Sequence, residues 1–189
     1  HLYQYIDSPK AQKLLVQNML KQKAVCFDTE TTSLNELEAE LIGMSFSYKK
    51  GLAYYIPLSE KREEVLETLE IFRPLFEKEE ILKIAHNLKF DYKVLKRYGI
   101  EVQGAIFDTM IAHYLLNPDG RHGMDYLSEI YLNYKPVSIE TLIGKGKNQV
   151  TLREVSIEEQ TNYAAEDADI TWQLYELFAP QMQKENLQD

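Results

Sequence analysis

The segment Ala24-Val25-Cys26-Phe27-Asp28-Thr29-Glu30 joins a short apolar run to two carboxylates, and the fold class follows from it. Four successive apolar residues bounded by polar ones predict a buried strand. If the backbone stays extended through residue 30, the side chains of Asp28 and Glu30 point to the same side. Two adjacent carboxylates repel each other, and a hard cation such as Mg²⁺ or Mn²⁺ relieves this repulsion. A solvated turn after the strand explains the tripeptide as well, because short motifs match by chance.

Hydrophobic patterns after this segment predict strands that alternate with helices. Residues 41–48 and 51–58 are rich in β-branched and aromatic side chains and flank the turn signal Lys49-Lys50-Gly51, so they predict a hairpin. Further short strands are expected at residues 81–85 and 105–107. Apolar spacings of three and four predict helices over about residues 60–76, 87–98, 108–116, 124–131 and 157–178. This order predicts an α/β fold with a mixed five-stranded sheet flanked by helices.

Local signals refine the ends of these elements. Pro74 is expected to kink or end the helix over residues 60–76. Asp108 and Asp125 are predicted to be helix N-caps, so we exclude them from a site. Residues 133–153 are polar and are predicted to be irregular.

Asp91 is a third candidate metal ligand. It follows Asn87 by four residues near the start of a predicted helix, so the two share a face, which continues through Val94 and Leu95. A carboxylate on a core-facing stripe needs a partner or a metal ion. A favourable interaction with the helix dipole is the alternative explanation.

Asp167 is the fourth candidate. In the last predicted helix it shares an apolar face with Tyr163, whereas Glu166 and Asp169 lie on more mixed surfaces. A core tyrosine beside a carboxylate that bonds the backbone is the alternative for this pair. A cluster of four inward acids without metal would be very destabilising, so the acids together predict a metal site. Its ligands are Asp28, Glu30, Asp91 and Asp167.

The motifs Asp28-x-Glu30, Asn87-x3-Asp91 and Tyr163-x3-Asp167 resemble the three exonuclease motifs of the DEDD superfamily. The tyrosine four residues before the last aspartate is typical of the tyrosine subgroup, because the histidine subgroup has a histidine where this chain has Asn162. Longer strings resemble the proofreading 3′→5′ exonuclease domain of bacterial DNA polymerase I (family A), over about residues 20–178. These strings are Phe107-Asp108-Thr109-Met110, Arg121-His122-Gly123-Met124-Asp125, Gly144-Lys145-Gly146-Lys147-Asn148-Gln149 and Tyr163-Ala164-Ala165-Glu166-Asp167-Ala168-Asp169.

The resemblance implies an RNase H-like (DnaQ-like exonuclease) fold and hydrolysis of terminal phosphodiester bonds of DNA to 5′-mononucleotides. Two divalent metal ions, Mg²⁺ or Mn²⁺, would lie about 3.5–4 Å apart. By the same resemblance, Asp28 bridges both ions, Glu30 and Asp167 complete the first, and Asp91 holds the second largely through water. Tyr163 would orient the attacking water. An unperturbed phenol has a pKa of about 10, so we expect the metal to do most of the deprotonation.

The resemblance also implies contacts to the DNA 3′ end. Leu34 and Asn87 match positions that contact the terminal nucleotides. Arg121 is a candidate phosphate ligand, although pairing with Asp119 or Asp125 is equally compatible with the sequence. At residue 139 an isoleucine stands where relatives carry an aromatic residue, so weaker base stacking is expected there. The candidate substrate contacts are Thr29, Thr31, Leu34, Asn87, Arg121 and Ile139.

The composition limits the class of protein. A net charge of −9 over 189 residues argues against a protein that grips nucleic acid through a broad basic face, but not against a nuclease whose acids surround metal ions. The single cysteine, Cys26, excludes an internal disulfide. No apolar run approaches the ~18 residues that cross a membrane. These features predict a cytoplasmic protein without membrane contact, and the resemblance to bacterial DNA polymerase I implies a bacterial one.

The resemblance sets the expected context of the chain. We expect residues 1–189 to form a single, monomeric domain from a longer polymerase that acts in DNA replication and repair, with the polymerase domain following at the C-terminus. Two alternatives stay open. One is a catalytically silent scaffold for a polymerase domain, and the other is an RNA-trimming exonuclease of the RNase D type.

Overall fold

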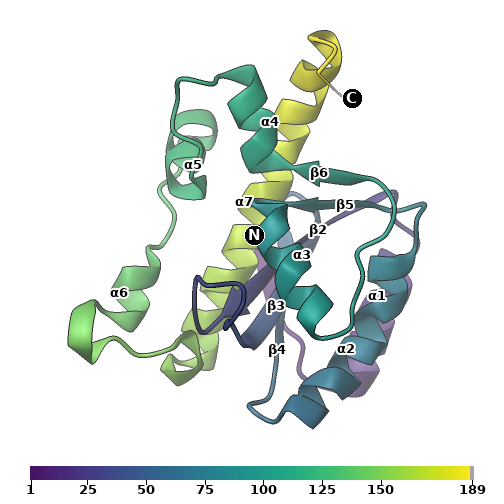
Figure 1. Ribbon diagram of the computed structural model, residues 1–189, viewed down its shortest axis with the longest axis vertical. Helices are drawn as coiled ribbons and strands as arrows, with labels where there is room; N and C mark the ends of the chain where they lie inside the picture. The colour runs from purple at the N-terminus through teal and green to yellow at the C-terminus, as the bar shows by residue number, and fades with distance from the viewer. Residues whose placement is uncertain (188–189) are drawn as a thin grey trace.

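A mixed six-stranded sheet with the order β1-β4-β3-β2-β5-β6 forms the centre of the fold in the computed structural model, which describes residues 1–187 (Figure 1). Strand β2 lies in the interior of the sheet, antiparallel to β3 and parallel to β5. The strands are β1 (Leu2–Tyr5), β2 (Ala24–Thr31), β3 (Leu41–Lys49), β4 (Leu52–Pro57), β5 (Leu82–Ala85) and β6 (Ile106–Asp108).

Helices cover both faces of this sheet. One layer contains α1, α2 and α3, whose apolar residues share a core with β2 and β3. The long helix α7 crosses the other face and contacts β1 to β5, while α4 and α5 pack against α7 (Figure 1). The helices are α1 (Pro9–Met19), α2 (Arg62–Glu77), α3 (Leu88–Arg97), α4 (Thr109–Leu116), α5 (Met124–Leu132), α6 (Ile139–Ile143) and α7 (Ile157–Lys184), with short 3₁₀ turns η1 (Gly146–Asn148) and η2 (Leu152–Glu154).

The predicted count of five strands is wrong, because residues 2–5 add a sixth. Strand β1 pairs in parallel with β4 at the edge of the sheet. A residue far along the chain holds β1 in position, because the hydroxyl of Tyr3 donates to Asp169 Oδ2 at 2.6 Å. The other carboxylate oxygen of Asp169 accepts from the backbone N–H of Gly51, at the turn between β3 and β4 (2.8 Å). Such a strand depends on distant partners and leaves no local turn or hairpin signal.

The predicted helices are present, with differences at their ends. Helix α2 continues past Pro74 to Glu77, because Leu75 and Phe76 are buried in the core and hold the last turn. Helix α7 extends beyond residue 178 to Lys184. Residues 133–153 were expected to be irregular, yet they contain the short elements α6, η1 and η2.

One of the two predicted N-caps is confirmed. The side chain of Asp108 accepts from the backbone N–H groups of Met110 and Ile111, as an N-cap does. The prediction for Asp125 is wrong, because Gly123 occupies the N-cap position of α5 and Asp125 lies in the first turn. There its negative charge interacts favourably with the helix dipole.

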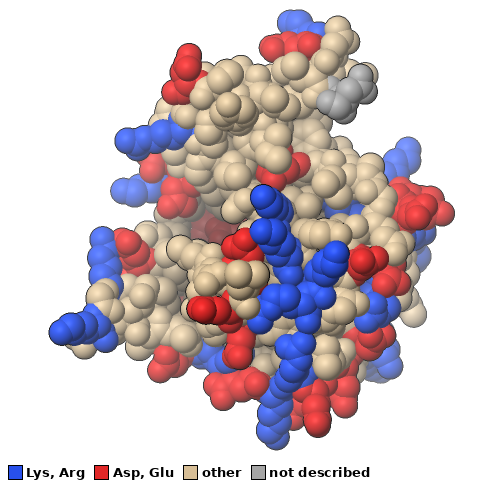
Figure 2. Space-filling view, viewed as in Figure 1, with Lys and Arg blue, Asp and Glu red and all other residues tan. Residues whose placement is uncertain are grey.

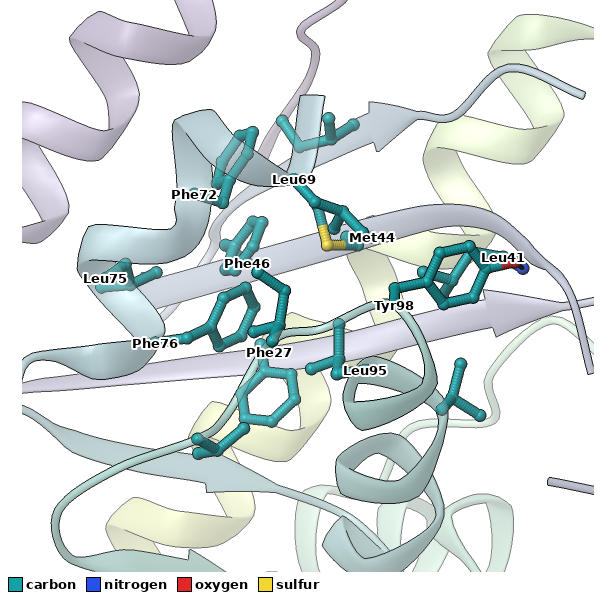
Figure 3. Close-up of a cluster of buried hydrophobic side chains, with 14 of the residues drawn as sticks. Phe27, Leu41, Met44, Phe46, Leu69, Phe72, Leu75, Phe76, Leu95 and Tyr98 are labelled. Atoms are coloured by element: carbon teal, nitrogen blue, oxygen red, sulfur yellow. Dashed lines mark hydrogen bonds between the residues drawn. The ribbon is translucent and has the colours of Figure 1, made fainter. Parts of the chain in front are cut away.

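An aromatic cluster anchors β2 to the layer of α1 to α3 (Figure 3). The rings of Phe46 and Phe72 stack with centroids 5.2 Å apart, and Phe27 meets Phe76 edge-on at the same separation. Because side chains alternate along a strand, Phe27 and Thr29 face this core while Asp28 and Glu30 face α7. The core thus holds the strand that presents both carboxylates.

Across residues 1–187, no helix combines the length and apolarity that a membrane span requires.

Candidate active site

Three carboxylates meet where β2 ends beneath α7. Asp28 and Glu30 come from β2 and Asp167 comes from α7, and each offers an oxygen atom within 4.8 Å of the other two. The pairing of β2 with β3 shifts register between Glu30 and Thr31. Irregularities of this kind are frequent beside active sites, where they redirect side chains. The structure therefore brings together three of the four predicted metal ligands.

The fourth predicted ligand, Asp91, lies on the other side of β2. Its carboxylate accepts from the backbone N–H of Thr29 at 3.2 Å and also from the Thr29 hydroxyl. Asp91 belongs to the first turn of α3 and is only 2 % exposed. The structure thus places it next to the other acids but outside the group of three. Thr29 is the residue that connects them.

Burial and mutual repulsion disturb the ionisation of all four acids. Loss of solvent raises the pKa of Asp28 to about 6. Burial, followed by repulsion from Asp28, raises the pKa values of Glu30, Asp91 and Asp167 well above the ordinary range. Each acid is therefore hard to ionise unless a positive charge lies nearby.

The cluster fits a divalent cation. Among the side chains in residues 1–187, Glu30 Oε1 is a buried oxygen without a hydrogen-bond partner. A buried acceptor left without a partner is costly, whereas a cation can satisfy it. Three carboxylate oxygens within reach of one another form a ligand set that hard cations such as Mg²⁺ prefer.

Tyr163 lies one helical turn before Asp167 on α7 and lines the same cleft. Burial, and then the nearby charges of Asp167 and Glu30, raise the pKa of its phenol far above the usual value. The phenol is therefore neutral at physiological pH. It can donate a hydrogen bond, but it cannot serve as a general base.

A cleft of about 720 Å³ opens over these residues. Its walls come from the end of β2 and the loop after it, from α3, and from the segment between α6 and η2. Four of the predicted substrate contacts line it: Thr29, Thr31, Leu34 and Ile139. The side chain of Leu34 is 93 % exposed, so its apolar surface is available to a ligand.

The structure does not bring the other two predicted contacts into this cleft. Asn87 is exposed and adopts the left-handed conformation (φ 62°) at the N-cap of α3, with its backbone N–H bonded to Asp108. Arg121 is exposed, and its guanidinium lies 5.8 Å from the centre of the Tyr126 ring. Within residues 1–187 it forms no salt bridge with Asp119 or Asp125. Their contacts to substrate remain predictions.

Sequence reasoning missed part of the cleft wall. Phe90 of α3 lines the cleft, and so do Ile143 and residues 149–152. The signal for Phe90 was an aromatic ring directly before Asp91. Helical periodicity does not distinguish this ring from one at any other position between the apolar and the polar face. For residues 149–152 the signal was the adjoining string 144–149, which resembles the polymerase exonuclease domain.

Comparison with known proteins agrees with this geometry. A family model described as 3′-5′ exonuclease matches residues 3–183. DNA polymerase I of Rhizobium leguminosarum is 40 % identical over 182 residues, which cover 84 % of this chain and 18 % of that protein. DNA polymerase I of Borreliella burgdorferi is 38 % identical over 176 residues, covering 92 % of this chain and 19 % of that protein. The chain spans about a fifth of the length of these curated relatives.

Solved structures confirm the predicted RNase H-like α/β fold. The catalytic core of RRP6 from Trypanosoma brucei superposes with a TM-score of 0.75 at 19 % identity, over 97 % of this chain and 47 % of that one. NrnC from Brucella melitensis, solved with bound Mg²⁺, gives a TM-score of 0.72 at 23 % identity, over 97 % and 82 % of the two chains. At such identities the likeness concerns the fold.

Proposed function

Because the chain belongs to the 3′-5′ exonuclease family that forms part of bacterial DNA polymerase I, we propose that it removes nucleotides from DNA 3′ ends by two-metal hydrolysis. The observation that carries this proposal is the group of Asp28, Glu30 and Asp167, with the unpartnered oxygen of Glu30. An acid cluster of this kind at the base of a cleft suits a nuclease whose substrate is itself an anion, because bound cations reverse the local charge.

The four acids have distinct places in the proposed centre. Asp28, Glu30 and Asp167 would hold one Mg²⁺ or Mn²⁺ ion, and Asp91, beyond Thr29, would hold a second together with Asp28. When bound, two such ions stabilise the attacking and leaving oxygens of a phosphoryl displacement. Thr29 fixes the Asp91 carboxylate through its N–H and its hydroxyl, so this acid is already oriented before any ion binds.

The remaining side chains orient the reactants. Tyr163 keeps its proton and donates a hydrogen bond that holds the attacking water. Leu34 presents exposed apolar surface to the terminal base. Phe90 supplies a ring in the cleft that contains Ile139, and base stacking on such a ring tolerates any base. These roles predict cleavage without sequence preference.

Cleavage of a single-stranded DNA labelled at its 5′ end tests the proposal. With Mg²⁺ or Mn²⁺ we expect a descending ladder of products. Asp28→Asn should abolish the ladder while circular dichroism shows an intact fold, because the variant loses a shared ligand. Glu176→Gln is the matched control, since this exposed acid lies outside the cleft on the same helix α7. No products from the unmodified domain at high concentration would refute the proposal.

We further propose that the domain proofreads within a longer bacterial DNA polymerase in the cytoplasm. The support is that the curated relatives named above are DNA polymerase I and extend well beyond the matched region. The coding sequence after residue 189 tests this directly, because a polymerase domain is expected there. Degradation of matched DNA and RNA strands tests the RNase D-like alternative, which predicts faster loss of RNA.

A further inference from the structure

Positive side chains gather along α3, although the chain as a whole carries a net charge of −9. The helix has four cations, and its one acid, Asp91, is buried. Figure 2 shows Lys and Arg grouped on the molecular face over this helix. None of the four is buried. We call them the α3 stripe: Lys89, Lys93, Lys96 and Arg97.

The spacing makes these four side chains one continuous surface. Residues three and four apart are neighbours on a helix, so Lys89 leads to Lys93 and then to Lys96 and Arg97. At a rise of 1.5 Å per residue the stripe extends for about 12 Å. Its beginning adjoins Phe90, which lines the cleft. The stripe therefore starts at the wall of the active site and runs away from it.

Two members of the stripe have partners within the protein. Lys93 Nζ lies 2.7 Å from Glu36 Oε1. Arg97 donates to the carbonyl oxygen of Ala39 at 2.6 Å and to that of Glu36 at 3.1 Å. These contacts tie α3 to the loop that carries Leu34. They also mean that Glu36 neutralises one charge of the stripe.

The other two members remain available to a ligand. Within residues 1–187, neither Lys89 nor Lys96 forms a salt bridge. Lys96 lies beside Tyr92, whose ring centre is 5.9 Å from its Nζ. Both side chains are therefore exposed to solvent without a compensating acid.

We propose that the α3 stripe binds the backbone phosphates of the strand that feeds the cleft, on the 5′ side of the nucleotides being removed. This inference rests on the proposed function for the identity of the strand as DNA. Lysines on a groove that also offers an aromatic ring are the usual means of holding a single strand without reading its sequence. The stripe supplies affinity that the acidic centre cannot, because bare carboxylates repel phosphate.

The test compares Lys89→Gln/Lys96→Gln with a control that removes the same charge elsewhere. Lys10→Gln/Lys13→Gln is suitable, because both lysines are exposed on α1, which contributes no residue to the cleft. Fluorescence anisotropy in EDTA measures binding of a labelled single strand of about 12 nucleotides. We expect the stripe variant to weaken binding about tenfold and the control to change it little.

Salt dependence gives a second readout. The slope of log affinity against log salt concentration should fall by about 1.4 in the stripe variant, since each phosphate contact on a single strand contributes about 0.7. Equal slopes and affinities in the stripe variant and the control would overturn the inference. In cleavage assays, the stripe variant should lose more of its cleavage rate on the long strand than on a dinucleotide.

Failure of this inference and failure of the proposed function are distinguishable. If the unmodified domain cleaves DNA but the stripe variant binds the long strand as well as the control does, only the stripe assignment is wrong. If the unmodified domain cleaves nothing with either metal, the nuclease proposal fails. The binding comparison in EDTA then still decides whether α3 contacts the strand.

Discussion

Tyr163 occupies a position in which releasing its proton would place a third negative charge beside Asp167 and Glu30. This supports the proposal that Tyr163 orients the water rather than transferring a proton. A hydrogen bond of this kind contributes about 1 kcal/mol to stability of the bound arrangement. Loss of this hydrogen bond should therefore lower kcat only modestly, and the change can be measured.

Tyr163→Phe should lower kcat by about fivefold and leave the pH profile of kcat unchanged, because only one hydrogen bond is lost. Steady-state cleavage over a range of pH checks this. A new pH dependence in the variant, or the disappearance of a basic pKa, would show that the phenol transfers a proton after all.

The residue patterns predicted the acids of the centre better than the residues around them. Asp28 and Glu30 could be found because strand alternation is strict, and Asp167 because the helical period separates it from Glu166 and Asp169. Phe90 could not be found, since periodicity places a side chain on a face but does not say that the face borders a cleft. That Asp91 bonds Thr29 depends on how α3 packs against β2, which no local pattern contains.

At the scale of elements, α7 carries two inward-facing aspartates with opposite consequences for stability: Asp169 is buried and Asp167 is partly buried. Asp167 belongs to the acid cluster, where burial and neighbouring charge raise its pKa. Asp169 accepts hydrogen bonds from Tyr3 and Gly51 and so ties α7 to β1 and the hairpin. Two residues of separation on a helix turn these side chains toward different partners.

Replacing each aspartate by asparagine separates the two functions. Asp169→Asn should lower the free energy of unfolding by about 1–3 kcal/mol, because it weakens hydrogen bonds to a buried charged group, while cleavage persists. Asp167→Asn should abolish cleavage and leave the metal-free domain at least as stable, because it removes repulsion. Urea unfolding and the ladder assay measure both. A less stable Asp167→Asn domain would contradict the view that the cluster is repulsive.

The elements themselves were predictable where local periodicity is strong. The helices α2, α3 and α7 and the β3–β4 hairpin follow from spacing and turn residues. Helix α2 keeps its predicted length although Pro74 lies within it, whereas the continuation of α7 past residue 178, through Pro180, was not predictable, because tertiary packing overrides a local breaker. Strand β1 was missed because its partners, β4 and α7, are far along the chain.

For the whole molecule, the acid cluster links stability to both pH and metal. An unfolded aspartate has a pKa of about 3.9, whereas Asp28 in the folded domain has one of about 6. Between these values the folded state holds protons that the unfolded chain has released. The free energy of unfolding therefore falls as pH rises through this window, and the more strongly shifted Glu30, Asp91 and Asp167 extend the fall to higher pH.

Mn²⁺ should remove this penalty by binding the ionised acids. Above neutral pH, we expect added Mn²⁺ to raise the melting temperature clearly. At a hundredfold excess over its Kd the stabilisation corresponds to about 2.7 kcal/mol. At about pH 5 we expect only a small rise. Differential scanning fluorimetry with and without EDTA measures the shift. Asp28→Asn is the control and should respond weakly. A metal effect that is equal at both pH values would argue against binding at these carboxylates.

The bond between Tyr3 and Asp169 spans 166 positions of the chain. During synthesis at about 5–20 residues per second, Tyr3 is added roughly 8–33 s before its carboxylate partner exists. Until Asp169 exists, the pairing of β1 with β4 lacks the hydrogen bond that ties β1 to α7. The helix that carries Asp167 to the acid cluster therefore also secures the edge strand of the sheet.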